Sequence, residues 1–149
     1  MKRHKSLYPL SHDHHHALVQ ARNLRLASSA TNGSSFSQAA GDFITFWDAN
    51  LERHFLQEEE ILLPVFANYI TADSSEILET LKQHLEIRRA CGDLRARISQ
   101  GRATGAEGLA LAEQLEQHIR YEENQLFPAI EEAVPEAELW AINRRLTGQ

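Results

Sequence analysis

The chain has 149 residues, of which 42% are hydrophobic and 24% are charged, and this fits one globular domain over residues 1–149. Its 21 acidic and 15 basic residues give a formal net charge of -6, so we expect neither nucleic acid nor an anionic membrane as a partner. The apolar runs are too short for a transmembrane helix, and the basic start lacks the apolar stretch of a signal peptide, which predicts a cytoplasmic protein.

Apolar residues recur at three- and four-residue spacing, and no segment alternates as a half-buried strand does, so the sequence predicts an all-α fold. Four long helices are expected over about 11–27, 35–69, 73–100 and 104–130. A loop rich in Ser, Thr, Asn and Gly should cover 28–35. A short fifth helix should begin at Pro135 and cover the end of the bundle with Leu139, Trp140, Ile142 and Leu146.

The predicted helix boundaries rest on capping patterns. Capping-box spacing occurs at Ser35 with Gln38, Asp73 with Glu76, and Thr104 with Glu107. Gly101 should end the third helix, because glycine readily adopts the left-handed conformation of a helix C-terminus. Pro64 and Pro128 lie inside the second and fourth helices, where each is expected to cause a kink.

The second and fourth helices carry an internal repeat with an offset of 64 residues. Five residues are identical within eleven aligned positions, namely His54, Glu58, Glu59, Leu62 and Pro64 against His118, Glu122, Glu123, Leu126 and Pro128. Residues four apart share one face of a helix, so each HxxxE places an imidazole beside a carboxylate. The repeat therefore predicts two matching halves of one metal site.

In an up-down-up-down bundle these two helices are diagonal, and the first and third helices would add side chains to the core between them. The third offers His84, and the first offers His14, which shares a face with Leu18, Ala21 and Leu24. His15 stays open as an alternative to His14. The predicted metal ligands are His14, His54, Glu58, His84, His118 and Glu122.

Four imidazoles and two carboxylates are enough for two metal ions, with positions left for hydroxide and a small diatomic ligand. The mixture of nitrogen and oxygen ligands suits iron, with zinc and manganese as alternatives. Ferritin-type sites use ExxH, so the HxxxE order argues against that family. Glu59 and Glu123 each follow a predicted ligand and turn about 100° away from it, so a supporting or solvated role is expected.

Four motifs together resemble the hemerythrin-like (HHE cation-binding) family: DHH at 13–15, HFLQEE at 54–59, HLEIRR at 84–89 and HIRYEENQLFP at 118–128. The resemblance spans about Leu10 to Ile130. It implies an up-down-up-down four-helix bundle, here with a short C-terminal helix. It also implies two non-haem iron ions (Fe²⁺/Fe³⁺) with a bridging hydroxide or oxo group, which bind or react with dioxygen, nitric oxide or peroxide. Sensing, scavenging and iron handling are the roles that this chemistry implies.

The sequence departs from the oxygen-carrying hemerythrins at two positions. The carriers have HxxxH in the third helix, whereas here Arg88 follows His84 at the fourth position. The carriers place an aspartate five residues after the histidine of the fourth helix, whereas here Glu122 follows His118 at four. The pattern is similar to bacterial sensing and iron-centre repair relatives with four histidines and two glutamates, which predicts irreversible oxidation rather than reversible oxygen carriage.

Other interpretations stay open. A four-helix interaction module with a structural metal site is the alternative function. An enzyme such as a peroxidase would need an electron donor, and the sequence does not identify one. His12, His15 and His16 are expected to be a polar helix start or a local metal-binding tract. Cys91 is the only cysteine and is expected to be a small core residue. A homo-oligomer is a further alternative for the assembly of the chain.

Overall fold

The computed structural model describes residues 2–29, 33–71 and 73–149, and every regular element within these ranges is helical, which confirms the all-α prediction. The elements are η1 (Lys5–Leu7), α1 (Tyr8–Ser28), α2 (Gly33–Phe46), η2 (Trp47–Leu51), α3 (Glu52–Gln57), η3 (Glu58–Leu62), α4 (Leu63–Ala67), α5 (Ser75–Ser99), α6 (Gly105–Tyr121), η4 (Glu122–Leu126), α7 (Phe127–Ala133) and α8 (Glu136–Thr147). In this described part of the chain, no helix is long and apolar enough to cross a bilayer.

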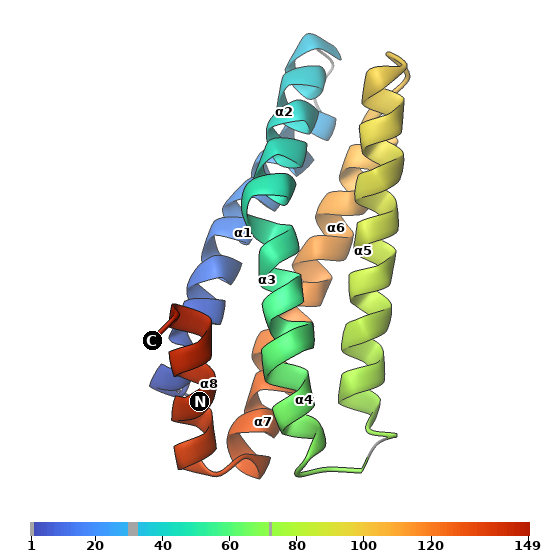
Figure 1. The fold of residues 1–149 in the computed structure, drawn as a ribbon. Helices are drawn as coiled ribbons and strands as arrows, with labels where there is room; N and C mark the ends of the chain where they lie inside the picture. The colour runs from blue at the N-terminus through green and yellow to red at the C-terminus, as the bar shows by residue number, and fades with distance from the viewer. Residues whose placement is uncertain (1, 30–32, 72) are drawn as a thin grey trace.

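Four helical columns lie along one long axis (Figure 1). The first is α1, the second runs through α2, α3 and α4, the third is α5, and the fourth runs through α6 and α7. The most extensive contacts of α1 are with α2 and α6, and those of α5 are also with α2 and α6. Side chains from all four columns can therefore meet in the space that the columns enclose.

Both internal prolines follow a π-helical turn. Pro64 comes two residues after the end of η3 and Pro128 two residues after the end of η4, and the intervening Leu63 and Phe127 amides donate to the carbonyls five residues earlier. Proline has no N–H and crowds the carbonyl four residues before it, and the wider π turn accommodates both effects. The columns continue through the two prolines, and the residues that open these π turns are Glu58 and Glu122.

The capping predictions are partly confirmed. The fourth column starts with Thr104, whose backbone N–H donates to the Glu107 carboxylate at 3.0 Å, as in a capping box. Gly101 has a φ of +67° just beyond α5, which confirms its C-terminal position. The N-cap of α5 is Ser74 and not Asp73.

The predicted loop between the first two helices is shorter than expected. α1 extends to Ser28, and α2 begins at Gly33, which is two residues before the predicted start at Ser35. Residues 30–32 of the predicted loop lie outside the described residues.

Buried apolar side chains form two clusters along the columns. One, which we call the α2 cluster, includes Leu24, Phe43, Trp47, Phe55, Leu94 and Leu115. The other, the α8 cluster, includes Leu10, Leu62, Phe66, Leu126, Phe127 and Leu139. Among the aromatic residues of the second column, Phe46 is partly exposed, whereas Phe43, Trp47, Phe55 and Phe66 are buried. Between the clusters lies a layer of buried polar side chains.

The buried faces of two helices differ from the predicted ones. Leu18 is 40% exposed, and Ala17 takes its place on the buried face of α1. On α5, apolar spacing predicts a face with Leu78, Leu81, Leu85 and Leu94, of which the first three are exposed and Leu94 is buried. The buried positions of α5 are Thr80, His84, Ile87, Cys91 and Leu94. The buried face of α5 begins with a threonine and a histidine, so hydrophobic periodicity alone assigned the wrong face there.

The short last helix begins after Pro135, as predicted. Figure 1 shows that α8 lies alongside the lower half of the molecule, and its contacts are with η1, η3 and α1. Leu139 and Ile142 are buried, whereas Trp140 is 38% exposed and packs edge-on against His4. The helix therefore covers the flank of the bundle instead of its end.

Close packing between α1 and α6 depends on glycine. A Cβ atom at Gly105 would lie 2.5 Å from the backbone oxygen of Ser28, and backbone cannot move aside as a flexible side chain can. We expect Gly105→Ala to lower the free energy of unfolding by about 1–3 kcal/mol, the usual cost of overpacking. Urea denaturation measures the effect. Gly92→Ala is the matched control, because no atom lies within 4 Å of its added Cβ and alanine favours a helix.

Candidate metal centre

The structure brings all six predicted ligands together in the polar layer between the two apolar clusters. Each of them is at most 2% exposed. They come from α1, α3, η3, α5, α6 and η4, in the order His14, His54, Glu58, His84, His118 and Glu122. His15, the alternative on the first helix, is exposed, as are His12 and His16.

The six side chains form two overlapping groups that could each hold a metal ion. One group contains His14, His54, Glu58 and Glu122, and the other contains Glu58, His84, His118 and Glu122. Within each group the candidate ligand atoms lie within 4.8 Å of one another. Each group therefore has two histidines of its own, and the two glutamates belong to both.

Each shared glutamate has one oxygen near each group. Glu58 Oε2 lies 3.3 Å from His54 Nε2, and Glu58 Oε1 lies 3.1 Å from His84 Nε2. Glu122 Oε1 lies 2.9 Å from His14 Nε2, and Glu122 Oε2 lies 3.4 Å from His118 Nε2. Each glutamate therefore presents one oxygen to each pair of histidines.

All four histidines direct Nε2 into the centre and pair Nδ1 with an oxygen outside it. The Nδ1 pairs are His14 with Glu123 at 2.6 Å, His54 with Asp13 at 3.0 Å, His84 with Glu59 at 2.5 Å and His118 with Gln83 at 2.8 Å. An imidazole that donates its Nδ1–H outward presents the Nε2 lone pair inward. These outer acceptors therefore favour the tautomer and the ring orientation that a metal ligand needs.

The four outer acceptors are placed in the same way around the bundle. Each acceptor is next in the sequence to a candidate ligand on its own column, and it contacts the histidine of a neighbouring column. The sequence predicted a supporting or solvated role for Glu59 and Glu123, and the structure places their carboxylates on His84 Nδ1 and His14 Nδ1. The sequence did not lead us to predict Asp13 and Gln83 as outer acceptors. Their position one residue before His14 and His84 was the available signal, because adjacent helical residues point about 100° apart.

Arg88 anchors one of these acceptors. Its guanidinium donates to both oxygens of Glu59, at 2.7 Å and 3.1 Å, and lies over the Phe55 ring at 5.6 Å. The Phe55 ring stacks on His84 with ring centres 3.9 Å apart. Arg88 therefore helps to hold His84 in place through Glu59.

The buried charges shift the pKa values of the centre strongly. Burial alone would lower the pKa of His54, but the charge of Glu58 and the hydrogen bond to Asp13 raise it to about 10. Burial also opposes the charged form of His84, yet hydrogen bonds to the glutamates around it raise its pKa to about 11. For His118, burial and the other histidines lower the pKa to about 3.

Three of the candidate ligand atoms make no hydrogen bond within the described residues, although each lies near an oppositely charged group. Glu58 Oε2, Glu122 Oε2 and His118 Nε2 are buried without a hydrogen bond in the described part of the chain. An unsatisfied buried polar group costs about 1–3 kcal/mol, so native proteins rarely leave three together. Bound cations would accept lone pairs from all three atoms, and the residues of the centre therefore fit two metal ions.

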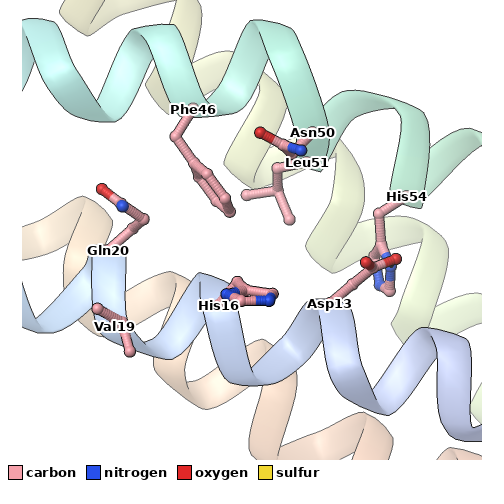
Figure 2. A pocket seen from close by; sticks show the side chains of 8 residues that line it. All are labelled: Asp13, His16, Val19, Gln20, Phe46, Asn50, Leu51 and His54. Atoms are coloured by element: carbon pink, nitrogen blue, oxygen red, sulfur yellow. The ribbon is translucent and has the colours of Figure 1, made fainter.

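A pocket of about 310 Å³ reaches the edge of the centre between α1 and the α2–α3 column (Figure 2). Its lining residues are Asp13, His16, Val19, Gln20, Phe46, Asn50, Leu51 and His54. Figure 2 shows the Asp13 carboxylate beside the His54 ring at one end of the pocket. The centre itself stays closed, since His54 is 1% exposed.

Loss of an outer acceptor should weaken the centre without removing a ligand. We expect Asp13→Ala to lower metal affinity by about 10- to 100-fold, because His54 loses the partner that orients its ring. Competition with a chelator of known affinity measures the change. Asp48→Ala is the control, since Asp48 pairs with Arg95 in an exposed ion pair. Equal affinity in both variants would contradict the role of Asp13.

Comparison with known proteins gives one match. No curated protein and no solved structure matches the chain significantly. A family model described as the hemerythrin HHE cation binding domain matches residues 6–130. This range covers most of the chain and includes all six residues of the centre, in agreement with the four sequence motifs. The chain belongs to the hemerythrin HHE cation-binding family.

Proposed function

We propose that this protein holds two non-haem iron ions and reacts with dioxygen, nitric oxide or peroxide, as a sensor, a scavenger or an iron-handling protein. One observation carries the proposal. Two buried groups with two histidines each share Glu58 and Glu122, and all four histidines direct Nε2 inward. We further propose that the frame is an up-down-up-down four-helix bundle and that residues 1–149 form a single domain.

The donor set supports iron and open coordination positions. Each group offers four ligand atoms, one from each of its residues. Two positions of an octahedral ion would remain for hydroxide and for a small oxidant. Imidazole together with carboxylate suits iron, and the two glutamates offset part of the charge of two cations. When bound, ferrous ions supply electrons to such an oxidant.

The protein contributes orientation and exclusion of water. Phe55 stacks on His84, and Phe127 stacks on His14 with ring centres 5.4 Å apart. Both phenylalanines are fully buried, so these faces of the histidines are closed to solvent. The outer acceptors keep the Nδ1–H groups engaged, so the four Nε2 atoms stay available to the ions. A centre built in this way favours small ligands over bulky organic substrates.

The test is the metal content of protein purified under reducing, oxygen-free conditions, followed by absorption spectra before and after air is added. The proposal expects two irons per chain and a new charge-transfer band in air. Decay of this band would distinguish a sensor or scavenger from a carrier. Zinc without a spectral change, or no tightly bound metal, would contradict the proposal and favour an interaction module with a structural metal site or no metal.

A further inference from the structure

Two histidines outside the centre form a pair on the surface of α1. His12 and His16 are one helical turn apart, and both are exposed. Their Nε2 atoms lie 3.1 Å apart, and the ring planes are nearly perpendicular at 89°. Neither residue belongs to the two ligand groups of the centre.

The geometry of this pair suits a shared metal ion. Two imidazole nitrogens on one tetrahedral ion, each about 2.0–2.1 Å from it, lie roughly 3.3 Å apart. Histidines four residues apart on a helix are also the spacing of zinc ligands in HExxH motifs. The remaining ligands would be water, because both side chains face solvent. An N–H···N hydrogen bond between the rings is the alternative explanation of the same distance.

One histidine of the pair borders the pocket that reaches the centre. His16 lines this pocket, and the Asp13–His54 pair lines it as well. Figure 2 shows His16 and Asp13 on the same side of α1, both facing the α2–α3 column. An ion that leaves His16 would next meet the carboxylate of Asp13, which is 37% exposed, and then the ring of His54.

We propose that His12 and His16 bind one divalent transition-metal ion, and that this surface site passes ions through the pocket to the buried centre. The binding step stands on the geometry of the pair and does not require a filled centre. The delivery step rests on the proposed di-metal centre. His12 and His16 thus become a capture site that raises the local concentration of metal beside Asp13.

The binding step is tested by Ni²⁺ titration of the full chain and three variants, His12→Ala, His16→Ala and His15→Ala. We expect His12→Ala and His16→Ala each to lose one ion that the parent protein binds, or to bind it about 100-fold more weakly. The single imidazole that remains in each variant cannot chelate the ion. His15→Ala should match the parent, since His15 is exposed but outside the pair. If all four proteins bind equal numbers of Ni²⁺ with equal affinities, the site does not exist and the contact is a hydrogen bond only.

The delivery step is tested by stopped-flow absorbance with Co²⁺ at concentrations below the Kd of the surface site. His16→Ala should fill the centre about tenfold more slowly than the parent and reach the same final spectrum, because only the local ion concentration has changed. Equal rates for His16→Ala and His15→Ala would overturn delivery. If Co²⁺ never enters the parent's centre while the Ni²⁺ difference persists, the proposed function fails and the surface site stands.

Discussion

Loading the centre with metal is expected to raise the Tm by roughly 10 °C. At a free ion concentration about a thousand times the Kd, binding to the native state adds about 4 kcal/mol, and each kcal/mol shifts the Tm of a domain of this size by about 2–4 °C. The structural reason is the cluster of buried ligand atoms that make no hydrogen bond in the described part of the chain. Thermal unfolding with metal and with a chelator measures the difference.

The metal-free protein should nevertheless remain helical at 25 °C. The α2 cluster and the α8 cluster lie on either side of the polar layer, and neither includes a residue of the centre. Circular dichroism at 222 nm should therefore change little when the metal is removed. A large loss of helicity would contradict this expectation and favour the structural metal module, in which the metal holds the fold.

The metal-dependent rise in Tm should be larger at pH 8 than at pH 6. In the metal-free protein, burial opposes the charged forms of His54 and His84, but the facing carboxylates raise their pKa values to about 10 and about 11. Their contribution to stability is complete below the unfolded pKa near 6.5 and is lost as the pH rises through the folded values. Metal binding must displace these protons, so it becomes more favourable as the pH rises. A smaller rise in Tm at pH 8 would contradict the assignment of both histidines.

The sequence was sufficient to find the centre because its ligands repeat. The HxxxE spacing of His54 with Glu58 and of His118 with Glu122 depends only on helix geometry, and the structure places all four side chains in one layer. His14 lies in this layer and His15 is exposed, although one reason for preferring His14 was wrong. The buried face contains Ala17 and not Leu18, and the two positions differ by one residue of helix rotation.

The outer acceptors could not be assigned to their partners from the sequence. Asp13 contacts His54, which is 41 residues away, and Gln83 contacts His118, which is 35 residues away. These pairs depend on the relative rotation of neighbouring columns, which side-chain packing sets and a single sequence does not reveal. The π turns before Pro64 and Pro128 were not predicted for a different reason. A kink and a π turn both relieve the clash between a proline ring and the carbonyl four residues before it, so the proline alone does not indicate which one forms.

Glu122→Ala should remove more metal than His54→Ala, although each substitution deletes one predicted ligand. Glu122 lies 2.9 Å from His14 Nε2, 3.5 Å from His84 Nε2 and 3.4 Å from His118 Nε2, so its loss affects both groups. His54 belongs to one group only. After desalting, we expect His54→Ala to keep about one of two ions and Glu122→Ala to keep fewer, because His54→Ala removes a ligand from one group and Glu122→Ala removes a ligand from both.

Matched variants separate this effect from misfolding. His15→Ala should keep both ions, since His15 is exposed on the same helix as His14. Glu122→Gln preserves the shape of the side chain and one oxygen but removes the bridging charge, so it should retain helicity and still lose metal. Two ions in both His54→Ala and Glu122→Ala would contradict the ligand assignment. Equal losses in the two variants would show instead that Glu122 serves one group, and that Glu58 alone connects the two.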